Sequence, residues 1–195
     1  MKLYDLDVSG NCYKVRLFAS LAHIELETVS VNIAAGEHKQ PPLSGLNPLG
    51  QLPVLQDGPD TFRDSQAILV YLAGAYGGLA WWPGHAQGQG EIVQWLSFAA
   101  NEVQHSLCTA RLIQKFGFVS DKAAALAKSA AVLSILDKHL EHHDWLAIGR
   151  PSIADCAVYP YVILAPEGDI DLSPYGHVAR WIERLKALPG YLPQP

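Results

Sequence analysis

Two serines stand where helices are expected to begin, and each of them can help to bind an anion. Ser9 follows a short strand-like segment and precedes apolar residues at helical spacing, while Ser65, next to Asp64, precedes a second such run. The first amides of a helix have no partner inside it, so a hydroxyl at that position and those amides point to the same place. Both positions also suit an ordinary helix cap, which is the simpler interpretation of the local spacing alone.

Three side chains near Ser9 compete for any chemistry at that turn. Asn11 is nearer the start of the helix and can share or replace the role of Ser9. Tyr4 carries a phenolic donor, but it comes early in the strand and is expected to be packed. Cys12 is the thiol close by in the sequence, and it can react only if it is exposed.

A strand, a turn and a helix must position these residues, and the N-terminal segment has that pattern. Residues 2–6 are a strand candidate, a helical repeat follows as far as Leu21, and residues 28–31 alternate as a half-buried strand does. After a loop rich in glycine and proline, two strand candidates flank the turn residues 57–60, which predicts an antiparallel hairpin. The next helix is predicted to start at residue 64 or 65 and to end near residues 77–78.

The second half of the chain is predicted to be helical. Residues 78–90 are rich in glycine, and we interpret them as a linker between an α/β domain at residues 1–77 and an all-helical domain at residues 91–195. Ser152 and Asp155 have the spacing of a capping box at the start of one of its helices. The predicted fold class is therefore α/β plus all-α. Apolar stripes at helical spacing lie in residues 92–103, 132–140 and 178–185.

Composition argues against several classes of protein. The net charge is −5 and the basic residues are scattered, so nucleic acid is not an expected partner. Hydrophobic residues make up 49% of the chain without an apolar run near ~18 residues, which indicates a globular protein and no membrane span. The three cysteines lie far apart and no secretory signal is recognisable, so we expect a cytoplasmic protein without disulfides or a thiolate zinc site.

Four features in a fixed order resemble a known family. The β-α-β pattern comes first, residues 47–55 then read NPLGQLPVL, residues 64–68 read DSQAI, and residues 152–155 read SIAD. Over nearly its whole length the chain resembles the cytosolic glutathione S-transferases, with Ser9 at the place of the serine used by theta-like, serine-type members. The resemblance implies a thioredoxin-like N-terminal domain, a helical-bundle C-terminal domain, glutathione as co-substrate and a homodimer.

The resemblance also implies where the thiol and the peptide backbone of glutathione bind. Ser9, with Asn11 as a partner or a replacement, is expected to stabilise the glutathione thiolate. Pro53 matches the proline that is cis in thioredoxin-like folds, and there the backbone of Leu52 is expected to pair with the extended tripeptide. Gln51 is expected to reach the glycine end of glutathione.

The two ends of glutathione are assigned from the same resemblance. Ser65 is expected to bind the α-carboxylate of the γ-glutamyl part, and Asp64 to orient its ammonium group. His38 and Lys39 lie in the proline-rich loop where related proteins place a cation for the glycine carboxylate. The alternative for each residue is a solvated side chain on a surface loop.

The second substrate is expected between the domains, against the helix after the linker. His105 and Arg111 are the better candidates there because they can bind acidic or carbonyl groups, although most polar residues of such a helix are simply surface. Residues 139–144 contain three histidines and an aspartate, but a helix C-terminus favours histidine in any case, so no metal is predicted.

We expect a glutathione transferase in which the thiolate attacks a small electrophile. Isomerisation, peroxide reduction or dehalogenation with the same ligand remain alternatives, as does a binding module without catalysis. Residues 9–11 read SGN, which departs from the Ser-Ser-Cys run of the zeta-type isomerases. Residues 9–12 also look like a thioredoxin-type Cys-x-x-Cys motif in which serine has replaced the first cysteine, so a dithiol cycle is not available.

Overall fold

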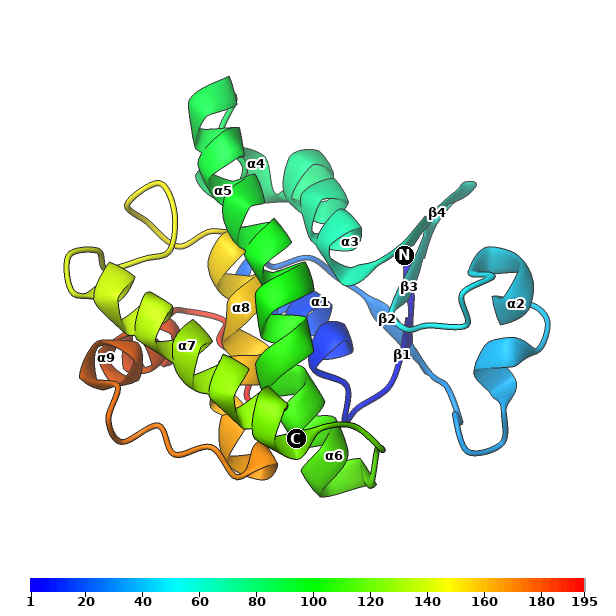
Figure 1. The fold of residues 1–195 in the computed structure, drawn as a ribbon. Coiled ribbons are helices and arrows are strands. Elements are labelled where there is room, and N and C mark those ends of the chain that lie inside the picture. The colour runs from blue at the N-terminus through cyan, green and yellow to red at the C-terminus, as the bar shows by residue number, and fades with distance from the viewer. Residues whose placement is uncertain (195) are drawn as a thin grey trace.

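Within the residues that the computed structural model describes, 1–194, the N-terminal part is built on a four-stranded sheet of order β2-β1-β3-β4 (Figure 1). Strand β1 (Lys2–Asp5) pairs in parallel with β2 (Glu27–Ser30) and antiparallel with β3 (Val54–Asp57). Strand β4 (Asp60–Arg63) pairs antiparallel with β3. The β-α-β unit and the hairpin predicted from the sequence are both confirmed, and together they form a thioredoxin-like domain.

Helices α1 (Gly10–Leu21) and α3 (Ser65–Leu72) lie between this sheet and the helical domain, as Figure 1 shows. The short α2 (Leu43–Leu46) lies at the other side of the sheet, after the single turn η1 (Glu37–Lys39). Helix α3 continues into the π-helical segment η2 (Ala73–Gly77), and Gly78, with φ of 65°, ends it where the sequence predicted. The starts of α1 and α3 therefore face the second domain.

The second domain is helical throughout its regular structure, as predicted. Its longest rod consists of α5 (Ala86–Phe98), the π-helical η3 (Ala99–Cys108) and α6 (Thr109–Phe116). Helix α5 thus begins inside the segment 78–90 that was expected to be the linker. At Gly88 a Cβ would come within 2.8 Å of His85 and Pro83, so this glycine permits close packing within the helix start. The remaining elements are α4 (Gly78–Trp81), α7 (Lys122–Leu140), α8 (Ile153–Ile163), η4 (Ala165–Gly168) and α9 (Gly176–Lys186).

One hydrophobic core runs through both domains, because α1 packs directly on α8. A Cβ on Gly10 would come within 2.7 Å of the Tyr161 ring, so the first turn of α1 approaches α8 as closely as a backbone can. The chain end also binds α1: the Tyr13 hydroxyl donates to the carbonyl oxygen of Leu192 at 2.6 Å. The packing fixes the start of α1 relative to the helical domain.

Helix α8 begins with the capping box that the sequence predicted. The Ser152 hydroxyl accepts from the amide of Ala154 at 3.2 Å, and the Asp155 carboxylate accepts from the amide of Ser152 at 3.0 Å. Both residues are buried. No helix in the described part of the chain combines the length and the apolarity that a membrane span requires.

Candidate functional site

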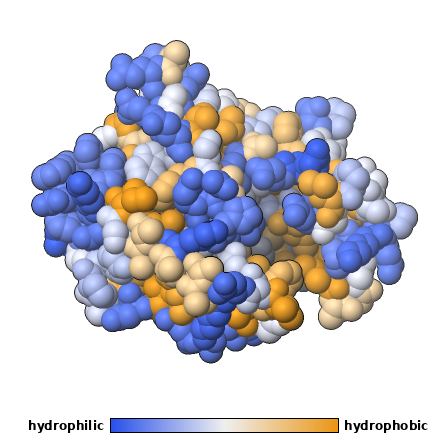
Figure 2. All heavy atoms as spheres, viewed as in Figure 1, coloured by the Kyte–Doolittle hydropathy of each residue, from blue (hydrophilic) through white to orange (hydrophobic). Residues whose placement is uncertain are grey.

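A cleft of about 740 Å³ lies between the two domains and collects most of the predicted site residues. The surface is hollowed at this junction in the space-filling view, and apolar residues gather along its rim (Figure 2). The N-terminal domain contributes the starts of α1 and α3 and the loops after β2 and before β3, and the helical domain contributes η3 and α6. The predicted residues that line the cleft are Ser9, Asn11, His38, Gln51, Leu52, Pro53, Asp64, Ser65 and His105.

Ser9 is the N-cap of α1 and lies at the floor of the cleft. Its hydroxyl accepts from the amide of Cys12 at 3.3 Å, which is a long bond, while the first internal bond of the helix joins the Tyr13 amide to the Ser9 carbonyl. The amides of Gly10 and Asn11 precede that bond and have no acceptor inside the helix. Ser9 and Asn11 line the cleft while Gly10 is buried against Tyr161, so the start of α1 presents the Ser9 hydroxyl and Asn11 to the cleft, and a helix start attracts negative charge.

The start of α3 meets the start of α1 across the cleft. The Ser65 hydroxyl lies 3.5 Å from Oδ1 of Asn11 and 2.5 Å from Oε1 of Gln66. Because Oδ1 of Asn11 faces Ser65, the amide nitrogen of Asn11 is left as a donor. Asp64 caps α3 by accepting from the amides of Gln66 and Ala67 at 2.9 and 3.1 Å, which leaves the Ser65 amide free.

Asp64 adopts a backbone conformation that is unusual for a residue with a side chain. Its φ is 76° and its ψ is 126°, outside the regions that L-residues favour. Strained backbone of this kind persists only where the surroundings enforce it, and it gathers at ligand sites. Here it turns the chain from β4 into α3, so that the Asp64 carboxylate both caps the helix and lines the cleft.

The loop before β3 forms the wall facing the two helix starts. The peptide bond between Leu52 and Pro53 is cis, as expected from the resemblance. Buried Asn47 holds the loop by donating to the carbonyl of Gln51 at 2.8 Å and accepting from the amide of Leu49 at 3.1 Å. The side chain of Asn47 therefore shapes the wall without lining it.

Of His38 and Lys39, the two residues of the proline-rich loop that were expected to bind the glycine carboxylate, only His38 lines the cleft. Its buried Nδ1 atom has no hydrogen-bond partner among residues 1–194. An unsatisfied buried nitrogen at the wall of a cleft is suited to a ligand. Lys39 is exposed and is absent from the cleft wall.

The helical domain closes the cleft with residues that sequence reasoning partly missed. His105 was predicted and lines the cleft, but Gln104 and the apolar Ala100, Leu112 and Phe118 were not. Residues 100, 104, 108 and 112 recur at the spacing of one helix face, so this stripe was a signal available in the sequence. The apolar side chains of Ala100, Leu112 and Phe118, with Ile33 from the opposite loop, line a compartment of the same cleft as Ser9.

Arg111 does not line the cleft, contrary to the expectation from the sequence. Its side chain is only 4% exposed and lies behind the cleft, where Nε donates to Glu167 at 2.5 Å and Nη1 donates to the carbonyl of Val8 at 2.9 Å. The reason is that η4 packs against α6 and brings Glu167 next to the guanidinium. Arg111 thus ties the helical domain to the loop that ends at Ser9.

Tyr4 and Cys12, which were considered beside Ser9 for the chemistry at this turn, do not line the cleft. The Tyr4 hydroxyl donates to Oε1 of Gln56 at 2.8 Å, so Tyr4 is packed on the sheet as expected. Cys12 is fully buried, and burial raises the pKa of its thiol to about 12. A protonated, inaccessible thiol does not act as a nucleophile at neutral pH.

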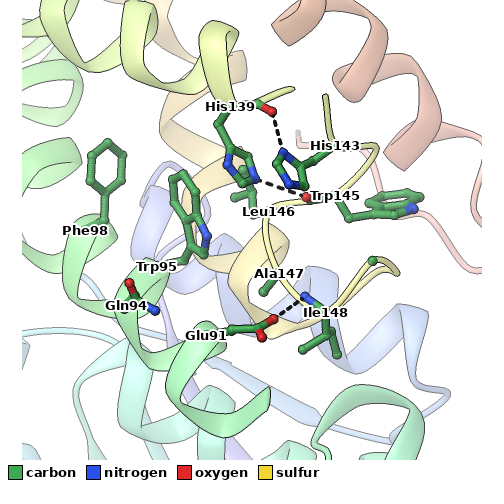
Figure 3. Close-up of a pocket in the computed structure, with 11 residues that line it drawn as sticks. Glu91, Gln94, Trp95, Phe98, His139, His143, Trp145, Leu146, Ala147 and Ile148 are labelled. Carbon is green, nitrogen blue, oxygen red and sulfur yellow. Dashed lines mark hydrogen bonds between the residues drawn. The ribbon is translucent and has the colours of Figure 1, made fainter. Parts of the chain in front are cut away.

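A second hollow of about 630 Å³ lies in the helical domain, between α5, α7 and the loop after α7 (Figure 3). His139 and His143 stack there with ring centres 4.3 Å apart and planes 4° from parallel. A nitrogen of His143 bonds the backbone carbonyl of His139 at 2.9 Å, and a nitrogen of His139 faces the carbonyl of Trp145 at 3.4 Å. The two rings do not converge on a common point, and no cluster of metal-ligating side chains occurs within residues 1–194.

Comparisons with known proteins point in one direction. The family description "Glutathione S-transferase, N-terminal domain" matches residues 3–80, and "Glutathione S-transferase, C-terminal domain" matches residues 108–189. Glutathione S-transferase 2 of Anopheles gambiae is 29% identical over 196 residues, which cover 97% of this chain and 92% of that protein.

Solved structures agree with this. A possible glutathione S-transferase from Rhodopseudomonas palustris is 32% identical, with a TM-score of 0.91, and the match covers 99% of this chain and 97% of that one. A glutathione S-transferase from Pseudomonas fluorescens is 28% identical with a TM-score of 0.92, and the match covers 99% and 98% of the two chains.

Proposed function

This chain belongs to the glutathione S-transferase family, and we propose that Ser9 and the start of α1 hold the sulfur of glutathione as a thiolate that attacks a small electrophile. Transferase activity and glutathione as co-substrate follow from the family. What is specific to this chain is the assignment of each part of the substrates to a part of the cleft. The observation that carries it is that Ser9, the N-cap of α1, and Asn11, in the first turn of the same helix, both line the cleft.

The electrostatic demand on that floor is modest. A free thiol has a pKa near ~8.5 and is only a few per cent ionised at neutral pH. Lowering the pKa by about two units requires about 2.7 kcal/mol. A hydrogen bond to a charged group contributes about 1.5 to 3 kcal/mol and a helix N-terminus about 0.3 to 1 kcal/mol, so Ser9 and α1 suffice without a general base.

The rest of glutathione is assigned to the walls of the cleft. The γ-glutamyl carboxylate binds the free amide and the hydroxyl of Ser65, and Asp64 balances the ammonium group beside it. The backbone of Leu52 pairs with the extended peptide as an added strand does. His38, with its unsatisfied ring nitrogen, binds the glycine carboxylate, in preference to the exposed Lys39.

The acceptor is an apolar molecule with one polar group. The compartment beside Ser9 is lined by apolar side chains from the loop after β2, from η3 and from α6, while Gln104 and His105 supply hydrogen-bonding groups at one side. The lining suits a small electrophile whose leaving group or carbonyl oxygen is stabilised by these two residues. Residues 190–192 lie against α1 and are not among the residues that line the cleft.

Replacing Ser9 by alanine tests the assignment. In Ser9→Ala the pKa of the bound glutathione thiol, read from ultraviolet thiolate absorbance or from the pH profile of kcat/KM, is expected to rise by about one to two units. Retention on immobilised glutathione is expected to persist, because the walls remain intact. An unchanged thiol pKa would contradict the role of Ser9, and Asn11→Ala then tests the neighbouring donor in the same assay.

Two further properties are part of the proposal. We infer a homodimer from the family to which the chain belongs, and Val93 on α5 and Ile135 on α7, which are 45% and 52% exposed, are available to such an interface. Sedimentation of the purified chain measures the mass directly, and a monomer at micromolar concentration would contradict the inference. A cytoplasmic location is supported by Cys12, Cys108 and Cys156, all free and buried thiols.

A further inference from the structure

Lys14, on the second turn of α1, is completely enclosed by the protein. Its relative exposure is 0%, and its Nζ atom has no hydrogen-bond partner among residues 1–194. Buried lysines are rare, and those that occur are almost always paired with an acceptor or an acid. The face of the Tyr161 ring, 5.3 Å from Nζ, is the contact that the structure gives this ammonium, and because no acceptor or acid bonds it, its enclosure is still costly.

The position of Lys14 relates it to the floor of the cleft. Lys14 and Gly10 are four residues apart and lie on the same face of α1. Both meet Tyr161 of α8: a Cβ on Gly10 would come within 2.7 Å of its ring, and Nζ of Lys14 lies 5.3 Å from the ring centre. Helical side chains lean toward the helix N-terminus, which directs the stem of Lys14 toward the turn that begins at Ser9.

The groups that face Lys14 compensate its charge only in part, because it has the Tyr161 ring and the field of Asp64 but no ion pair or hydrogen bond. Cys108 on η3 and Tyr161 on α8 are close, but burial raises the pKa of both groups, so both are neutral. Asp64, at the start of α3, is the carboxylate whose charge reaches Lys14, and it is exposed in the cleft. Arg111 acts on Cys108 and Tyr161 from another side, and its charge is balanced by Glu167.

We propose that the Lys14 ammonium stabilises the glutathione thiolate through space. The inference rests on the proposed function, in which that thiolate lies at Ser9. Lys14 does not touch the sulfur, so it acts as a positioning charge rather than a catalytic residue. A positive charge in a medium of low dielectric constant acts over several ångströms and is screened little by salt.

Lys14 carries its positive charge at neutral pH. Burial lowers the pKa of Lys14 to about 8, so the ammonium form predominates at pH 7 when the cleft is empty. A thiolate nearby favours the charged form further. Because the unfolded chain holds this proton more tightly, the stability of the empty protein is expected to rise as the pH goes from about 8 to about 10.5.

Replacing Lys14 by methionine, which keeps the volume of the stem, tests the proposal. In Lys14→Met the pKa of the bound glutathione thiol is expected to rise by about one, so that kcat/KM falls about tenfold below that pKa and converges with the original value at high pH. The midpoint of urea unfolding at pH 7 is expected to stay the same or to increase. Lys2→Met, at a half-exposed lysine of β1, is the matched control and changes neither quantity.

Binding of S-methylglutathione separates the thiolate from the carboxylates of the same ligand. Its sulfur cannot ionise, so its affinity is expected to be equal in Lys14→Met and in the original protein. Equal weakening of both ligands would overturn the proposal, because the charge would then serve the γ-glutamyl carboxylate at Ser65. Failure of both Lys14→Met and Lys14→Leu to fold would also overturn it, since the lysine would then be required for structure.

The two variants distinguish a failure of the Lys14 proposal from a failure of the proposed function. If Ser9→Ala raises the thiol pKa and Lys14→Met does not, the proposed function stands and the role of Lys14 is refuted. If neither variant changes the thiol pKa, the thiolate does not lie at the start of α1 and both proposals fail.

Discussion

The starts of α8 and α1 are both led by a serine, yet they differ in what surrounds them. At α8, the Asp155 carboxylate accepts from the amides of Ser152 and Leu146 and from the indole of Trp181, at 3.0, 3.1 and 2.9 Å, and the whole group is buried. At α1, the Ser9 hydroxyl has one long bond, and the start of the helix lies at the cleft.

The difference teaches that a helix start becomes a ligand site through what covers it. The loop before α8 and helix α9 bring donors onto Asp155, so that end is closed by the protein itself. At the start of α1, Ser9 and Asn11 line the cleft, whose other walls include the loop before β3 and η3. A closed start contributes to stability, and an open one is left to bind an anion.

The largest effect is expected at the closed start. Asp155→Ala leaves four buried donor bonds without an acceptor, and we expect the free energy of unfolding to fall by about 3 to 5 kcal/mol in urea denaturation. Asp171→Ala is the control, because exposed Asp171 bonds only Ser173 in its own turn. A loss below about 1 kcal/mol in Asp155→Ala would show that water replaces the carboxylate.

A crossed pair of serine variants sharpens the comparison. Ser152→Ala is expected to cost about 1 to 2 kcal/mol of unfolding free energy while the pKa of the bound glutathione thiol stays unchanged. Ser9→Ala is expected to cost at most about 1 kcal/mol of stability while kcat/KM at neutral pH falls about 10- to 100-fold. Urea unfolding and steady-state kinetics on both variants check this. If both variants lost similar amounts of stability and of kcat/KM, the contrast between the closed start of α8 and the open start of α1 would be wrong.

A smaller effect is expected at the start of α3. Ser65→Ala removes one hydroxyl from the site of the γ-glutamyl carboxylate, so the Kd for glutathione measured by calorimetry is expected to rise about tenfold, which corresponds to about 1.4 kcal/mol. The thiol pKa is expected to stay where it was, because Ser9 is untouched. Ser134→Ala, at an exposed serine of α7, is the control, and equal affinities in both variants would remove Ser65 from the site.

The smallest effect is expected at Cys12. Its thiol is buried and its pKa is raised to about 12, so Cys12→Ala is expected to keep kcat/KM within about twofold. Steady-state assays at neutral pH measure this, together with the rate at which an alkylating reagent modifies the native protein. A large loss of activity, or rapid alkylation of Cys12, would show that the thiol opens to the cleft and takes part in the reaction.

Local chemistry made the helix starts predictable. Caps at Ser9, Asp64 and Ser152 follow from side chains that bond amides two or three residues away, and the structure confirms all three. The prediction that Arg111 lines the cleft was wrong because its partners Val8 and Glu167 are 103 and 56 residues away in the sequence. No local pattern indicates contacts over such separations.

The sequence by itself determined the two-domain fold class, the hairpin and the helix starts, because periodicity, turns and caps are set by neighbours in the chain. Only the tertiary structure decided that Lys39 and Arg111 do not line the cleft while Gln104 does, and that Lys14 is enclosed against Tyr161. Exposure, charge compensation and unsatisfied donors depend on which distant elements pack together, and packing is a property of the whole chain.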